Sequence, residues 1–144
     1  MTVEMLQPGD WLNLATEFEK LKNEGPQFFN WTRQSAMAEF SKSCTLILKR
    51  DDEIAAFLTY REYPDRLEIM AVGTNSRFRR LGLGCKVLTS LKSIAAERSL
   101  SIWLEVHENN QQAVKFYEKN HFQVIQTRKT YYSDGGAALI MRLL

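Results

Sequence analysis

Residues 79–84 read RRLGLG and stand at the predicted start of a helix. Glycine lets a backbone approach a ligand closely, and the first N–H groups of a helix, with its dipole, attract anions. With Arg77 adding charge nearby, this turn predicts a binding site for a phosphate or pyrophosphate group. The alternative is an ordinary strand-to-helix turn in which the glycines serve packing. A dinucleotide-binding fingerprint would need a third glycine at the position of Val87, and a nucleoside-triphosphate-binding loop would need Gly-Lys-Ser/Thr. Neither a dinucleotide-binding nor a nucleoside-triphosphate-binding enzyme is therefore expected.

Two further side chains could transfer protons. Glu105 offers a carboxylate that can take a proton, and Tyr117 offers a phenol that can donate one. By spacing alone, Glu105 is an exposed acid on the polar face of the strand 102–106. Tyr117, beside Phe116 on a helix, is by the same argument a core aromatic. The pattern therefore leaves the chemical and the structural interpretation of both residues open.

No metal site is predicted from the remaining candidate ligands. His107 and His121 have no accompanying ligand cluster, and we expect them to be surface or packing residues. Cys44 and Cys85 lie far apart in sequence and indicate neither a disulfide framework nor a metal quartet.

Hydrophobic periodicity predicts the elements that must position these residues. A first helix is expected at 11–21, with Asp10 as its N-cap and an end signal at Gly25-Pro26. Further helices are expected at 33–40 after the cap Thr32, from Gly84 to 98, and at 111–117 after the cap Asn110. Strands are expected at 45–48, 54–60, 67–72 and 102–106, with a terminal hairpin formed by 122–130 and 138–143. This order predicts an α/β fold in which a mixed sheet carries helices on both faces.

Composition excludes several classes of protein. Nineteen basic and 17 acidic residues give a formal charge of +2, without the basic excess of a nucleic-acid binder. The length of 144 residues and the 44% apolar content predict one domain over 1–144. No apolar run approaches the roughly 20 residues that span a bilayer, and Glu4 stands where a secretory signal would be basic. We therefore expect a cytoplasmic protein without nucleic-acid or membrane partners, either a monomer or a homodimer.

Four motifs resemble one known family. Arg79-x-x-Gly82-x-Gly84 matches the Q/R-x-x-G-x-G/A acetyl-CoA signature of the GCN5-related N-acetyltransferase (GNAT) superfamily. LEVHENN at 104–110 and AVKFYEKNHF at 113–122 are similar to the L-E-V-x-x-x-N and A-x-x-x-Y-x-x-x-G-F patterns of protein N-terminal acetyltransferases, including the RimI-type ribosomal-protein alanine acetyltransferases. YYSDG at 131–135 resembles the Y-Y-x-D-G loop of the same branch. The resemblance extends from about Leu67 to Met141, with His121 in the usual glycine position.

The resemblance implies the GNAT fold, a mostly antiparallel sheet in which two parallel strands, here 67–74 and 102–106, splay apart to admit acetyl-CoA. Backbone groups near Val72, Gly73 and Thr74 would bind the pantetheine and polarise the thioester carbonyl. The pyrophosphate would lie on the backbone N–H groups of Arg79, Arg80, Leu81, Gly82, Leu83, Gly84 and Cys85. Asn110 matches a cofactor-contacting position and is also a suitable helix cap.

The resemblance also assigns roles in catalysis. Glu105 matches the family's general base and Tyr117 its general acid, in a direct transfer within a ternary complex that needs no metal. Because direct transfer needs no acyl-enzyme, Cys85 is expected to be an inert thiol near the cofactor. Tyr131 and Tyr132 would contact the first residues of the acceptor.

A protein N-terminal α-amine is the expected acceptor. With pKa values of about 8 and about 10.4, roughly a tenth of α-amines but roughly one in 2,500 lysines are free base at pH 7, so a single carboxylate base suits the former. A ribosomal protein is one hypothesis, although Gly136-Ala137 stands where the family has an acidic pair that would suit a basic acceptor. A small amine, such as a polyamine, amino acid or aminoglycoside, is the alternative. A catalytically silent acyl-CoA-binding regulatory module is the non-enzyme alternative, against which Glu105 and Tyr117 argue.

Overall fold

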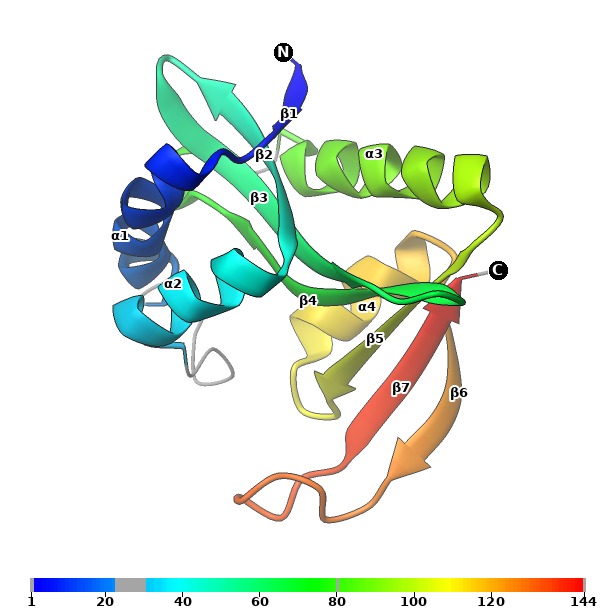
Figure 1. Cartoon of the computed structure of the whole chain (residues 1–144). Coiled ribbons are helices and arrows are strands. Elements are labelled where there is room, and N and C mark those ends of the chain that lie inside the picture. The colour runs from blue at the N-terminus through cyan, green and yellow to red at the C-terminus, as the bar shows by residue number, and fades with distance from the viewer. Residues whose placement is uncertain (1, 23–30, 80, 144) are drawn as a thin grey trace.

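The computed structural model describes residues 2–22, 31–79 and 81–143, apart from the side chains of 19–22 (Figure 1). The predicted helix end at Gly25-Pro26 lies outside these residues. The helices are α1 (Trp11–Lys22), α2 (Arg33–Lys42), α3 (Leu83–Arg98) and α4 (Gln111–Lys119), with 3-10 turns at Pro8–Asp10 and Ser76–Phe78. The strands are β1 (Val3–Met5), β2 (Cys44–Arg50), β3 (Glu53–Glu62), β4 (Arg66–Thr74), β5 (Ser101–His107), β6 (Gln123–Arg128) and β7 (Ala138–Leu143).

Seven strands form one sheet in the order β1-β2-β3-β4-β5-β7-β6. Within the described residues β4 and β5 are the one parallel pair, and the other neighbouring strands are antiparallel. α1 and α2 cover one face of this sheet, and α3 and α4 cover the other (Figure 1). The predicted mixed α/β sheet with helices on both faces is therefore confirmed. β1 does not appear in the sequence prediction because three residues are too few for alternation to be recognised.

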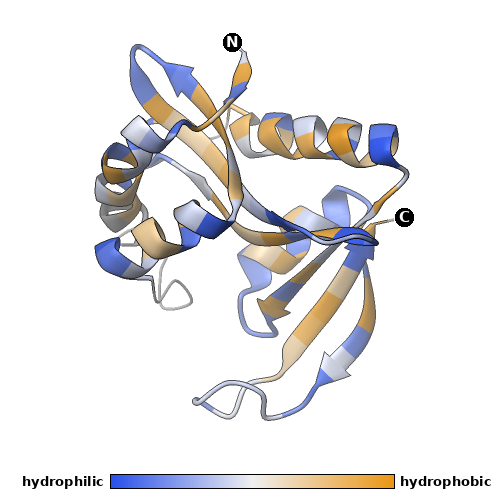
Figure 2. Cartoon of the chain, viewed as in Figure 1, coloured by the Kyte–Doolittle hydropathy of each residue, from blue (hydrophilic) through white to orange (hydrophobic). Residues whose placement is uncertain are grey.

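Each face of the sheet has its own hydrophobic core. Figure 2 shows apolar residues along the central strands and on α3, whose Leu88 and Leu91 are fully buried, as their helical spacing predicts. On the opposite face, Phe18 of α1 stacks on Trp31 and packs at a tilt against Phe57 of β3, with ring centroids 5.3 Å apart in both pairs. None of the described helices is long and apolar enough to cross a membrane.

Local hydrogen bonds set where helices begin. The Thr32 hydroxyl accepts a hydrogen bond from the Ser35 N–H at 3.1 Å, and the Ser35 hydroxyl accepts one from the Thr32 N–H at 2.7 Å, so the predicted cap of α2 is a complete capping box. Asn110 caps α4, its Oδ1 accepting from the Ala113 N–H at 3.3 Å. His121 follows α4 with a φ of 74°. The turn is thus made without glycine, at a cost of about 1 kcal/mol.

One extra residue breaks the alternation of β4. Adjacent residues of β3 pair with Ile69 and Ala71, so Met70 has no partner in β3 and forms a bulge. Parallel pairing with β5 ends at the preceding residue, where Ile69 lies opposite Leu104. Because a bulge bends its strand, the rest of β4 separates from β5 (Figure 1). Residues 70–74 of β4 and 105–107 of β5 do not pair with each other, and we call this stretch the β4–β5 fork. It confirms the predicted splaying of a parallel pair.

Candidate active site

The predicted phosphate-binding turn ends at the start of α3. Gly82 is the N-cap of this helix and has a φ of 71°, in the left-handed region that glycine tolerates best. The helix begins at Leu83, so Gly84 and Cys85 lie in its first turn and not in the preceding loop. The N–H groups at the beginning of a helix have no intrahelical acceptor. The sequence 83–86 contains no acid, so the positive end of the helix dipole is not neutralised from within this turn.

Gly84 lies where three elements meet. A methyl group added there would be 3.4 Å from a ring carbon of Phe116 in α4 and 3.6 Å from Thr74 Oγ1 at the end of β4. Two of the predicted cofactor residues, Thr74 and Gly84, are therefore brought together by the fold. Val72, Gly73 and Thr74 all pair with β3 along one edge of β4, while their other edge borders the β4–β5 fork. Backbone groups on that edge are placed to bind an extended ligand.

The other predicted cofactor residues have different surroundings. Asn110 is occupied as the cap of α4, and Cys85 Sγ accepts a hydrogen bond from Asn120 Nδ2 at 3.7 Å. Arg79 follows the 3-10 turn, Leu81 is 46% exposed, and Arg80 lies outside the described residues.

Arg77, which the sequence suggested as a further positive charge beside the turn, forms an ion pair instead. Its Nη1 donates to Glu53 Oε2 at 2.7 Å, so its charge is balanced from β3.

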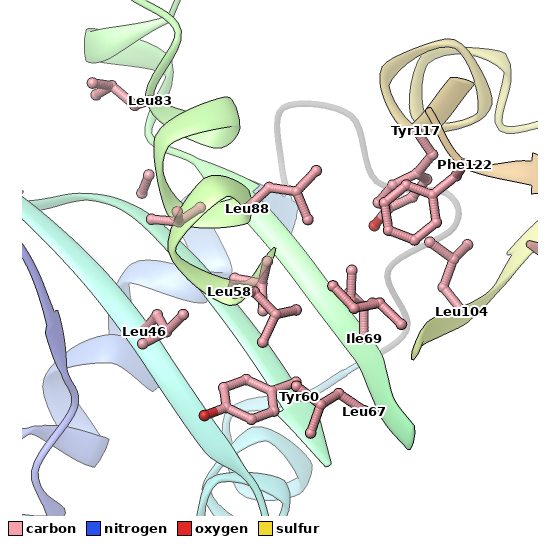
Figure 3. Packing of buried hydrophobic residues seen from close by; sticks show 14 of the residues in the cluster. Leu46, Leu58, Tyr60, Leu67, Ile69, Leu83, Leu88, Leu104, Tyr117 and Phe122 are labelled. Atoms are coloured by element: carbon pink, nitrogen blue, oxygen red, sulfur yellow. The ribbon is translucent and has the colours of Figure 1, made fainter. Parts of the chain in front are cut away.

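Tyr117 lies in the core between α4 and the sheet, with 7% of its surface exposed. Its ring packs edge-on against Phe116 and Phe122, at centroid distances of 5.3 and 5.5 Å. Figure 3 shows Tyr117 and Phe122 together above Leu104 of β5. Burial raises the pKa of the Tyr117 phenol above its ordinary value near 10. The phenol therefore holds its proton throughout the neutral range, as a general acid must.

Glu105 lies on the opposite side of the sheet. Its strand neighbours Leu104 and Val106 belong to the core beneath α3 and α4, so alternation directs Glu105 toward the face that α1 and α2 partly cover. Its side chain is 31% exposed, and its Oε1 accepts a hydrogen bond from Arg128 Nη1 at 3.4 Å. The pKa of Tyr132 is raised, first by burial of its phenol and second by the negative charge of Glu105. The fold thus brings Glu105 close to Tyr132, one of the predicted acceptor contacts.

Tyr131 and Tyr132 belong to the loop between β6 and β7. Their rings meet edge-on at 5.1 Å, and the Arg128 guanidinium lies over the Tyr131 ring at 5.8 Å. Tyr131 is half exposed, whereas Tyr132 stacks on His107 at a centroid distance of 4.7 Å. The two tyrosines therefore differ in kind, one open to solvent and one fixed against β5.

His107 is the residue whose role the sequence did not reveal. It is 7% exposed, its Nε2 is 2.8 Å from Asp134 Oδ2, and its Nδ1 accepts from the Asn109 N–H at 3.0 Å. The same Asp134 accepts from the Gly136 N–H at 2.8 Å, and this bond is the first cause of the lowered pKa of Asp134, His107 being the second. His107 thereby ties the tyrosine loop to β5. Its position two residues after Glu105, on the same strand face, was the available signal.

The site is divided between the two faces of the sheet. Tyr117 and the start of α3 lie on one face, and Glu105 with the tyrosine loop lies on the other. The β4–β5 fork is the place where the sheet is interrupted between them. Such an arrangement places a carboxylate on one face of the fork and a protonated phenol on the other, the two kinds of group that acid–base chemistry needs.

Known proteins share this sequence pattern. The model of the acetyltransferase (GNAT) family matches residues 9–122. Ribosomal protein bS18-alanine N-acetyltransferase of Haemophilus ducreyi is 32% identical over 108 residues, which cover 72% of this chain and 74% of that protein. N-alpha-acetyltransferase 50 of Danio rerio is 39% identical over 69 residues, or 46% of this chain. The matched segment is 41% of the length of that zebrafish protein.

The fold is shared with a solved structure as well. The crystal structure of the ribosomal-protein-S18-alanine N-acetyltransferase from Escherichia coli has a TM-score of 0.82 and 24% identity, covering 99% of this chain and 92% of that one. The family match spans most of the chain and includes the fork, the start of α3 and α4. The chain therefore belongs to the acetyltransferase (GNAT) family, and within it is similar to the protein N-terminal acetyltransferases.

Proposed function

We propose that this protein transfers the acetyl group of acetyl-CoA to the N-terminal α-amine of a protein. The observation that supports this most directly is the β4–β5 fork, with Tyr117 on one face of the sheet and Glu105 on the other. The names of the relatives, N-alpha-acetyltransferase and ribosomal protein bS18-alanine N-acetyltransferase, support the same acceptor class.

The residues around the fork fit a CoA thioester. The first N–H groups of α3 suit its pyrophosphate, and the edge of β4 at Val72, Gly73 and Thr74 suits its extended pantetheine. Gly84 lies beside Thr74 and Phe116, so the start of α3 and the end of β4 approach each other closely here. When bound there, acetyl-CoA would supply the acetyl group as an activated thioester.

Two proton transfers are assigned to this chain's side chains. Glu105, directly or through water, takes a proton from the acceptor ammonium so that the free amine can attack. Tyr117 donates its phenolic proton to the departing sulfur, and burial keeps that proton in place until then. Tyr131 and Tyr132 line the acceptor side beside Glu105 and would position the first residues of the peptide.

The test is an acetyl-transfer assay over a panel of acceptors. Peptides that begin with Ala, Ser or Met should be acetylated, whereas the same peptides with blocked N-termini and an internal lysine, and small amines, should react far more slowly. Glu105→Gln and Tyr117→Phe should each lower kcat at least about 100-fold, the usual contribution of general acid–base catalysis. Both variants should still be stabilised by acetyl-CoA, by about 2.7 kcal/mol at 100 times its Kd. Preferential acetylation of a small amine, or full turnover by both variants, would refute the proposal.

A further inference from the structure

We infer that Arg128 selects acceptors by charge, so that the preferred N-termini carry an acidic side chain at the second or third residue and basic ones are disfavoured. This inference rests on the proposed function, because it concerns the acceptor of that reaction. It is carried by the position of one guanidinium between the proposed base and a proposed peptide contact.

Arg128 is the last residue of β6, next to the tyrosine loop. Its Nη1 lies 3.4 Å from Glu105 Oε1, and its guanidinium lies over the ring of Tyr131. The Arg128 side chain is 48% exposed, so an incoming peptide can reach it without displacing other protein. One exposed cation therefore stands at the edge of the acceptor site.

Binding of an acceptor changes the partner of Glu105. The N-terminal ammonium is itself a cation, and where Glu105 binds it directly the ammonium shares the carboxylate with Arg128, which contacts its Oε1. Arg128 is then open to a second anion. Each extended residue advances the chain by about 3.5 Å, so a carboxylate on the second residue lies within reach of a guanidinium that had contacted Glu105. A lysine or arginine at that residue would instead place two like charges together.

The acid in the loop does not offer Arg128 an alternative partner. Asp134 is engaged through both oxygens, one by the Gly136 N–H and the other by His107. The residue after Arg128 is Lys129, also exposed, which adds a second positive charge rather than compensating the first. An acidic side chain of the acceptor would therefore add a counter-charge beside Arg128 that the described loop does not place there.

The same face of the sheet continues with further positive charge. Trp103 precedes Glu105 by two residues, about 7 Å along β5, and the Arg66 and Arg142 guanidiniums lie 5.0 and 5.3 Å from its ring. Within the described residues neither arginine forms an ion pair, and the Nε of each is buried without a hydrogen-bond acceptor. Glu68, paired with Trp103 in register, is the acid beside them. A carboxylate on the third residue of a peptide running along this face would meet these cations.

The experiment compares peptides that differ only at the second residue, with Asp, Ala or Lys there, and measures kcat/KM for each. The wild-type protein should prefer Asp over Lys by roughly severalfold, the size expected when an attractive contact with an exposed cation is replaced by a repulsive one. Arg128→Lys should keep the preference, Arg128→Gln should bring the Asp-to-Lys ratio close to one, and Arg128→Glu should invert it. Because exposed charges are screened by salt, 1 M NaCl should shrink the wild-type ratio.

Arg98 provides the matched control. It is 49% exposed and donates to Glu62 at 2.6 Å, an exposed arginine–glutamate pair like that of Arg128 but at the end of α3. Arg98→Gln should leave the Asp-to-Lys ratio unchanged. Thermal melting checks that each variant folds, and if Arg128→Glu does not, the glutamine and lysine variants decide the question.

Two outcomes would overturn the inference, and they differ. If peptides are acetylated but the wild-type protein does not discriminate by charge, or Arg128→Gln discriminates as the wild type does, Arg128 is not a specificity residue and the proposed function stands. If no peptide of any charge is acetylated, the proposed function fails and the inference falls with it.

Discussion

The acceptor side of the site depends on contacts between single residues that are distant in sequence. His107 joins β5 to the tyrosine loop through Asp134 and through the ring of Tyr132. This arrangement requires a glycine at 136, because a Cβ at that position would lie 2.3 Å from the imidazole of His107. The loop backbone and the histidine ring are therefore fitted to each other, and Tyr132 keeps its place beside Glu105 as a result.

Gly136→Ala should therefore displace His107 and loosen the loop. We expect a loss of about 1–3 kcal/mol in the free energy of unfolding, the usual cost of overpacking, and a higher KM for peptide at nearly unchanged affinity for acetyl-CoA. Urea unfolding and steady-state kinetics measure the two effects. Gly9→Ala is the control, since nothing lies within 4 Å of its added methyl group. In a His107→Ala background the Gly136→Ala penalty should largely disappear, and a persisting penalty would mean that the clash is not with His107.

At the scale of elements, the residue that caps a helix is also a predicted cofactor contact. Asn110 caps α4 through its Oδ1, and α4 in turn holds Tyr117. The same residue was predicted to contact the cofactor from its place in a motif. These two roles involve different atoms in principle, because a cap uses the side-chain oxygen and leaves the amide nitrogen to donate.

Substitution of Asn110 separates the two roles. Asn110→Ala should lower the free energy of unfolding by about 1 kcal/mol through loss of the cap, whereas Asn110→Ser should restore most of that loss because serine also caps. If Asn110 contacts acetyl-CoA as well, both variants should raise the Kd for acetyl-CoA, measured by calorimetry. If the Kd for acetyl-CoA instead rises in Asn110→Ala and returns to the wild-type value in Asn110→Ser, in parallel with stability, Asn110 acts as a cap alone.

Sequence reasoning succeeded where many residues repeat one signal. The helices with buried apolar stripes and the capping residue Thr32 were predicted, as were the terminal hairpin and the α/β class. It did not reveal the bulge at Met70, because an extra residue in one strand is visible only against the register of its partner. It also did not find the His107–Asp134 contact, which joins positions 27 residues apart through a loop whose path the sequence does not specify. Motif similarity supplied Glu105 and Tyr117, which spacing alone left as a surface acid and a core aromatic.

At the scale of the whole molecule, the phenol that we propose as the proton donor lies inside one of the two cores. Tyr117 is buried in the same cluster as Leu104 and Phe122 (Figure 3), and burial alone raises the pKa of its phenol. In the unfolded chain the phenol titrates near pH 10. Below that pH both states hold the proton, and above it the unfolded state releases the proton first. Since the unfolded state then binds fewer protons, stability falls as the pH rises.

Alkaline unfolding should therefore depend on Tyr117. Between about pH 10 and pH 11.5 the free energy of unfolding should fall more steeply in the wild-type protein than in Tyr117→Phe, by up to about 1.4 kcal/mol per pH unit. Urea titrations at a series of pH values measure this difference. Tyr131→Phe, which removes the hydroxyl of a half-exposed ring, is the control and should keep the wild-type slope. Parallel curves for wild type and Tyr117→Phe would show that the phenol is not protected in the folded protein.

The bulge at Met70 also changes the phase of the strand pleat. Before it, Leu67 and Ile69 contribute odd-numbered side chains to the core beneath α3 and α4; after it, Ala71 enters the opposite core and Val72 packs against the first. β4 thus contributes side chains to both cores because the bulge shifts its register by one residue. The shift occurs where β4 stops pairing with β5. The opening that would receive the donor therefore begins where one extra residue of β4 shifts the register of the strand.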